Sequence, residues 1–207
     1  MVSTTNRPST RRQKVHGVYC IESDWWQAPD VASVRPVMEM LHQWSPFHVP
    51  FVHRDVATRD EFEHYLKEWS SAKCNKFPIL YIALHGTNGS VSFGDGRKPS
   101  NSVGLNEIGE SLYGRCHGRV IHFGSCDTVS IHGHTLKKFL RNTGALCVSG
   151  YGDSLNWMEA SALDLLWFAA LQGHAMARNG VVASEKELNL SSKSLMIRGE
   201  MKIVRSP

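Results

Sequence analysis

A cysteine and a histidine each follow one of the most apolar segments of the chain. Residues 77–86 read FPILYIALHG and end in His85-Gly86, and residues 120–126 read VIHFGSC and end in Cys126. A thiol becomes a nucleophile when a base removes its proton, and imidazole can do this near neutral pH. The two segments therefore predict a dyad in which Cys126 attacks a carbonyl and His85 carries the proton. The amides of Gly86 and Cys126 would hold the oxyanion, and the missing Cβ of Gly86 would let the substrate approach the backbone.

Both members of the dyad also have a structural interpretation. Free cysteine is often buried as a small apolar residue, and a histidine after a strand can simply hydrogen-bond the next loop. The chain has five cysteines and no CxxC pair, which argues against a disulfide framework and a structural zinc site. His132 and His134 are a weak metal-binding pair, and His122 is expected in the core. We expect no cofactor.

Strand and helix patterns alternate along most of the chain. Three continuous apolar runs predict strands buried on both faces of a sheet, and they are separated by segments with helical periodicity. Thr58 and Glu61 form a capping box, and Gly144 ends a later helix. This order predicts an α/β fold with a mainly parallel sheet flanked by helices. Sites in such folds lie at the carboxyl ends of the strands, where His85, Cys126 and Asp153 are expected.

The order of these motifs resembles that of the caspase-like cysteine peptidases (clan CD), and CHAT-domain proteases in particular. The resemblance rests on ILYIALHG, the hairpin-like SVSFGDG, VIHFGSC, TGALCVSG and the apolar helix in NWMEASALDLLWFAALQG, all within residues 15–175. It implies a three-layer caspase-like fold and a cysteine endopeptidase. The caspase pentapeptide with Gln-Ala-Cys is absent, and GSCDT stands in its place. The resemblance further implies limited cuts in a partner protein, such as a pore-forming or effector protein, in antiviral defence or programmed death of bacteria, with an activating partner protein.

The resemblance also implies a substrate pocket beside the cysteine, built from strand ends and the loop after Cys126. An acidic pocket would prefer Arg or Lys in the substrate by charge pairing. Asp127 and Asp153 have an alternative role as caps of the helices that follow them, and Asp153 is the preferred pocket residue. The acidic and aromatic candidates for the pocket are Asp127, Asp153, Trp157, Glu159, Glu22 and Asp24.

Bulk properties exclude several other classes of protein. The 207 residues carry a net charge of +4 without a basic run or stripe, so nucleic acid is not an expected partner. No apolar run is long enough to span a membrane, and no apolar segment follows the basic N-terminal residues, so we expect a cytoplasmic protein. The expected parts are a flexible basic tail (1–14), the peptidase domain (15–184) and a C-terminal arm (185–207).

Two other readings of the sequence stay open at this point. A caspase-like interaction module without activity would have the same fold, with His85 and Cys126 failing to converge. A nucleotide-binding domain is disfavoured, because CIESDWWQAPD follows the first strand where a glycine-rich phosphate loop would stand.

Overall fold

A computed structural model describes residues 14–24, 32–94 and 99–206 of the chain. Its main sheet has six strands in the order β2-β1-β3-β7-β8-β9. The first five of these are parallel to one another, and β9 runs antiparallel to β8. The strands are β1 (Val18–Glu22), β2 (Phe51–Asp55), β3 (Ile79–Ala83), β7 (Val120–Phe123), β8 (Cys147–Gly150) and β9 (Lys202–Arg205).

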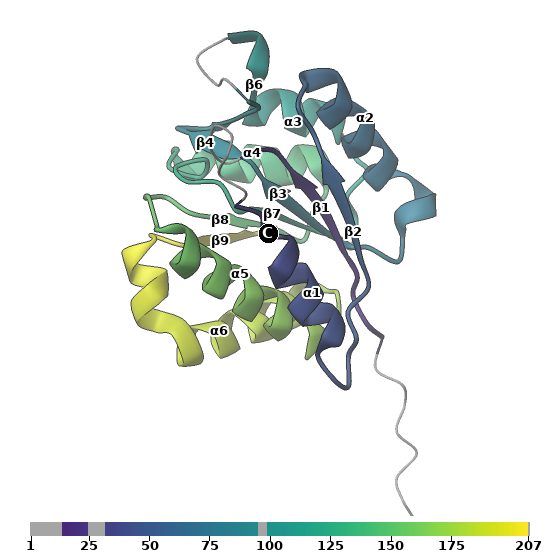
Figure 1. Cartoon of the computed structure of the whole chain (residues 1–207), viewed down its shortest axis with the longest axis vertical. Coiled ribbons are helices and arrows are strands. Elements are labelled where there is room, and N and C mark those ends of the chain that lie inside the picture. Colours follow the sequence, from purple (N-terminus) through teal and green to yellow (C-terminus); the bar gives the residue numbers. More distant parts are fainter. Residues whose placement is uncertain (1–13, 25–31, 95–98, 207) are drawn as a thin grey trace, which may run out of the picture.

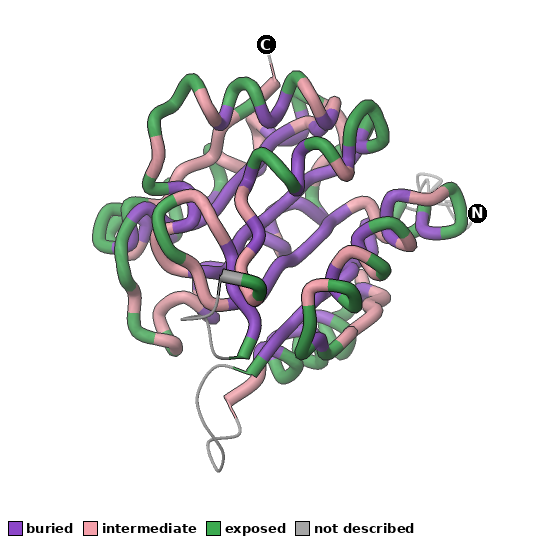
Figure 2. Tube along the Cα trace, turned by 90° about the horizontal axis from the view of Figure 1, so that it is seen from above, coloured by how far each residue is buried: buried purple, intermediate pink, exposed green. Residues whose placement is uncertain are grey.

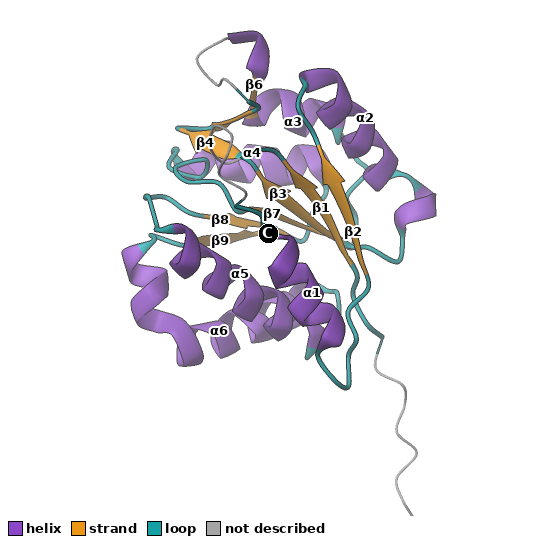
Figure 3. Ribbon diagram, viewed as in Figure 1, coloured by secondary structure: helices purple, strands orange, loops and turns teal. Residues whose placement is uncertain are grey.

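Helices cover both faces of this sheet, as Figures 1 and 3 show. One face carries α1 (Arg35–Gln43), α5 (Trp157–Gln172) and α6 (Arg178–Arg198), and the other carries α2 (Arg59–Ser70), α3 (Leu105–Ser111) and α4 (Gly133–Thr143). Each face has its own cluster of buried apolar side chains, and the central strands between them are buried (Figure 2). The predicted α/β fold, a mainly parallel sheet flanked by helices, is confirmed.

A second, smaller sheet follows β3 directly. It contains three antiparallel strands, in the order β4-β5-β6. The sequence predicted a hairpin here, but the chain bends at Leu84, so that His85 and Gly86 belong to β4 and not to the end of β3. The remaining elements are β4 (His85–Thr87), β5 (Ser90–Ser92), β6 (Ser102–Gly104) and the short 3₁₀ helices η1 (Ala72–Cys74) and η2 (Pro99–Asn101).

The helix ends follow their sequence signals. The capping box of α2 is confirmed, since the amide of Glu61 donates to Oγ1 of Thr58 and the amide of Thr58 donates to the Glu61 carboxylate. Gly144 ends α4 in the left-handed conformation, with φ 75°. Asn156 caps α5 through its side-chain oxygen, which accepts a hydrogen bond from the amide of Glu159.

The C-terminal part of the chain is not a separate arm, and the predicted boundary after residue 184 is wrong. Helix α6 continues from Arg178 to Arg198 across it and packs on α5. Strand β9 then pairs with β8, with Val204 opposite Val148. A polar helix and a half-buried edge strand carry weak sequence patterns, because they bury apolar side chains on one side only.

The predicted N-terminal tail, apart from Lys14, lies outside the described residues. Among the described helices, none combines the length and apolar character that crossing a membrane requires.

Candidate functional site

A cavity of about 290 Å³ opens at the carboxyl edge of the main sheet. Strands β3 and β7 are parallel neighbours, with Ile82 opposite Phe123, so the residues that follow them emerge at the same edge. The predicted dyad residues His85 and Cys126 both line this cavity. Its lining includes His85, Gly86, Cys126, Tyr81, Trp157 and Asp164.

Gly86 lies directly against the segment that carries the cysteine. A Cβ built at this position would overlap Oγ1 of Thr128 and the carbonyl oxygen of Cys126, and would lie 2.8 Å from Cβ of Ser125. The sequence suggested that the missing Cβ makes room for a substrate, whereas in the structure it makes room for the cysteine segment. Glycine is needed here because two backbone segments pack against each other.

The turn after β7 holds the cysteine in place by internal contacts. The hydroxyls of Ser125 and Thr128, both fully buried, lie 2.7 Å apart, and the Thr128 hydroxyl also lies 3.4 Å from the carbonyl oxygen of Cys126. Asp127 adopts a left-handed conformation, with φ 55°, and its carbonyl accepts a hydrogen bond from the amide of Ser130. Cys126 therefore lies in a tight turn that lines the cavity.

Cys126 differs from the other four thiols in its exposure. It is half-buried, whereas the others are buried, and burial raises the pKa of each of those other thiols. For Cys116 the pKa rises to about 12. A raised pKa keeps a thiol protonated and unreactive near neutral pH. These four buried thiols are therefore interpreted as structural: they are Cys20, Cys74, Cys116 and Cys147.

Three of the predicted pocket carboxylates do not line the cavity. Asp153 is exposed, and its Oδ1 accepts a hydrogen bond from the amide of Ser154. Glu159 forms an ion pair with Arg198, and Asp127 lies in the turn described above. These positions correct the expectation of a pocket formed by Asp127, Asp153 and Glu159.

The helix-capping alternative for Asp127 and Asp153 is also wrong. Asn156, and not Asp153, caps α5, while α4 has no side-chain cap at all. Of the other candidates, Asp24 is exposed and lies outside the cavity. Trp157 does line it, and its buried Nε1 has no hydrogen-bond partner among the residues that the structure describes.

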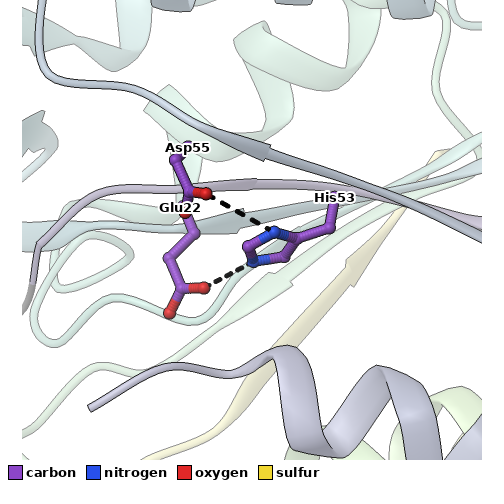
Figure 4. Close-up of side chains that lie close together, drawn as sticks. All are labelled: Glu22, His53 and Asp55. Carbon is purple, nitrogen blue, oxygen red and sulfur yellow. Dashed lines mark hydrogen bonds and ion pairs between the residues drawn. The ribbon is translucent and has the colours of Figure 1, made fainter. Parts of the chain in front are cut away.

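Glu22, the last pocket candidate, is buried in a network at the ends of β1 and β2. Its carboxylate accepts hydrogen bonds from the amide of Val34, from the hydroxyl of Ser33 and from Nε2 of His53, at 2.6–2.7 Å. Figure 4 shows the His53 ring between the carboxylates of Glu22 and Asp55. The network fixes the start of α1, where Val34 lines the cavity.

The group in Figure 4 also has the residue types of a metal site. Donor atoms of Glu22, His53 and Asp55 lie within 4.8 Å of one another. Because protein donors already surround the Glu22 carboxylate, we interpret the group as a support of α1. The weak pair His132 and His134 has stacked rings 5.7 Å apart, and no third ligand joins it among the described residues.

Sequence reasoning did not single out Asp164, a buried carboxylate that lines the cavity. Asp164 interrupts the apolar helix α5 and has a side chain only 2% exposed. It accepts hydrogen bonds from the hydroxyls of Tyr81 and Tyr151 and from Nε2 of His122 at 2.7 Å. The signal was present in the sequence, because a charged residue in the middle of a buried helix needs partners. His122 lies in the core as predicted.

The fold and this site define an α/β protein with a cysteine and a histidine at the carboxyl edge of a mainly parallel sheet. The chain belongs to a family described as Family of unknown function (DUF6642), which matches residues 15–190. No curated protein matches the chain in sequence.

Proposed function

We propose that this protein is a cysteine endopeptidase that uses Cys126 as nucleophile and His85 as general base and acid. The observation that carries the proposal is the cavity that both residues and Gly86 line at the carboxyl ends of two adjacent parallel strands. We also propose that the chain is related to the caspase-like peptidases, and to CHAT-domain proteases in particular. The proposed reaction needs no cofactor.

The chemistry needs two covalent steps. Sγ of Cys126 attacks the peptide carbonyl carbon while His85 accepts the thiol proton, and the C–N bond then breaks as His85 gives that proton to the leaving amine. In the second step His85 takes a proton from water, the hydroxide attacks the thioester, and the C–S bond breaks. The proton returns to the sulfur, so atoms and charge balance over the cycle.

Two backbone amides support the proposed oxyanion hole. No hydrogen bond between described residues uses the amide of Cys126. Thr87 and Ser90 form the last pair of the hairpin, which closes around a two-residue turn. The pair next to it joins Gly86 to Val91. Because hydrogen-bonded and non-hydrogen-bonded pairs alternate, we expect the Gly86 amide to point away from β5. Both amides would then be available to stabilise the negative charge that develops on the carbonyl oxygen.

The resemblance to CHAT-domain proteases also suggests the biological context that we propose. The substrate would be one partner protein, a pore-forming or effector protein, cut at a limited number of sites during bacterial defence or programmed death. An activating partner protein would control the activity. This context rests on analogy between folds and not on the geometry of the site.

Covalent labelling tests the dyad. The full-length protein is treated with peptidyl acyloxymethyl ketones carrying Arg, Asp or Leu next to the reactive group, and the alkylated cysteine is identified by peptide mapping. We expect selective modification of Cys126, because the other thiols are buried. Loss of a general base costs about 10²–10⁴-fold in rate. His85→Ala should therefore slow the labelling of Cys126 by a factor of this size.

The matched control is His134→Ala, which removes an exposed imidazole outside the cavity. Labelling of this variant should equal that of the unmodified chain. If Cys126 reacts no faster than Cys74, and if His85→Ala labels as fast as His134→Ala, the peptidase proposal fails. The inactive interaction module would then be the better interpretation.

A further inference from the structure

Strand β9 forms one edge of the main sheet, at the opposite end from β2 (Figure 1). It pairs with β8 on one side, and no described strand pairs with its other side. At the end of the β8–β9 ladder, the amide of Ser206 donates to the carbonyl oxygen of Leu146. Because the backbone groups of successive residues in a strand point to opposite sides, those of Ile203 and Arg205 point away from β8. Strand β9 therefore offers backbone donors and acceptors at an open edge.

A groove of about 510 Å³ lies beside this strand. Its lining includes Ile203 and Val204, which pack against the apolar clusters on opposite faces of the sheet. Lys137 of α4 lines the groove from one face, and Val182 of α6 lines it from the other. A groove that borders β9 and helices of both faces follows the edge of the sheet, where a further strand would lie.

The charged residues that line the groove are all basic. They are Lys137, Arg178 and Arg205, and no carboxylate among the described residues lines it. Arg205 forms an ion pair with Glu185 at 3.2 Å, whereas no ion pair between described residues includes Lys137 or Arg178. Nη2 of Arg178 donates to the carbonyl oxygen of Ser206, and a guanidinium has further N–H donors. Two cations beside the open edge can therefore pair with a ligand.

We propose that the free edge of β9 binds an extended, acidic segment of a partner protein, which adds a strand to the sheet. The backbone of the segment pairs with the outward groups of Ile203 and Arg205. Its carboxylates pair with Lys137 and Arg178, and its apolar side chains contact Val182.

A second copy of the chain fits this edge less well than an acidic partner. A two-fold contact uses the same surface on both subunits, so the cations of one groove would face those of the other. Basic residues on an edge strand also oppose pairing between copies. The same charges attract a segment rich in Asp or Glu, so they favour the acidic partner.

A set of capped, fluorescently labelled peptides tests the edge. The full-length protein is titrated with Glu-Val-Glu-Val-Glu-Val, and binding is followed by fluorescence anisotropy. One control peptide is Lys-Val-Lys-Val-Lys-Val, which reverses the charge. The other is the acidic sequence with N-methyl groups on its two central residues, which blocks both of its hydrogen-bonding edges. We expect the acidic peptide to bind at least about tenfold more tightly than either control, a difference of about 1.4 kcal/mol.

Two double variants locate the charges that bind the peptide. Lys137→Gln with Arg178→Gln removes two cations of the groove and should weaken binding by about 2–30-fold, the value of two exposed ion pairs. The matched control is Lys138→Gln with Arg141→Gln, which removes two exposed cations outside the groove and should leave binding unchanged. Equal losses in the two double variants would assign the effect to net charge and overturn the inference.

Amide hydrogen exchange, measured by NMR, locates the peptide on the unmodified chain. At a peptide concentration about tenfold above Kd, the amides of Ile203 and Arg205 should exchange about tenfold more slowly, and the amides of β2 should keep their rates. Protection of β2 alone, or equal affinity for the three peptides, overturns the inference. A free chain that sediments as a dimer and becomes a monomer with the peptide would assign the edge to a second copy, which also overturns it. No part of the experiment depends on the proposed peptidase activity.

Discussion

Replacement of Gly86 by alanine should separate activity from folding. The new Cβ would overlap the Cys126 carbonyl oxygen and Oγ1 of Thr128, and these atoms belong to a buried turn and not to the end of a flexible side chain. The turn must therefore move to admit the methyl group. Because the same turn carries the proposed nucleophile, the movement would displace Sγ relative to His85.

The size of both effects follows from the contact. Overpacking of this kind costs about 1–3 kcal/mol, and the lower entropy of the unfolded alanine chain offsets about 0.4–1 kcal/mol of it. The net loss of about 1–2 kcal/mol corresponds to a decrease in Tm of about 2–8 °C for a chain of this length. A displacement of about 1 Å at reacting atoms can cost about 10²-fold in rate, so activity should fall far more than stability.

The assay compares Gly86→Ala with Gly133→Ala in thermal unfolding and in the labelling rate of Cys126. A Cβ at Gly133 would meet no atom within 4 Å, so this variant should keep its labelling rate and gain or lose little stability. The reasoning is refuted if Gly86→Ala labels as fast as the unmodified chain with the same Tm, because the close packing of the two segments would then be absent.

Two further predictions concern the surroundings of the cavity. Glu22→Gln should destabilise the protein by about 1–3 kcal/mol in urea unfolding, because the charge of a fully hydrogen-bonded buried group is lost. Glu39→Gln breaks only an exposed ion pair and should cost less than about 0.5 kcal/mol, and equal costs would argue against the buried network. Burial raises the pKa of Tyr19, Tyr81 and Tyr151, so the folded protein retains protons that the unfolded chain releases near pH 10. The free energy of unfolding should therefore fall as the pH rises above about 10, and Tyr81→Phe should weaken this dependence; an unchanged slope would contradict the assigned burial.

The elements around the proposed dyad could be predicted because their signals are local. Continuous apolar runs marked β3 and β7, and Gly144 marked the end of α4. Since parallel neighbours share an edge, the position of His85 and Cys126 at one cavity followed from the order of the elements.

The chemistry of the pocket could not be predicted in the same way. Asp164 meets Tyr81 and His122 only after α5 packs on the sheet, across 83 and 42 positions of sequence. The apolar periodicity of a segment predicts a helix, but it does not predict which strand residues that helix will contact. The carboxylates that follow the strand ends were therefore preferred, although Asp153 lies on the surface.

Cleavage of peptide bonds is the central claim and can be measured directly. The purified full-length protein is incubated with a diverse peptide library, and new termini are identified by mass spectrometry, with Cys126→Ala and His85→Ala as parallel samples. The account predicts new termini with the unmodified chain and none with either variant. The account would be contradicted if the folded, unmodified chain produced no new termini. It would also be contradicted if Cys126→Ala produced the same termini as the unmodified chain.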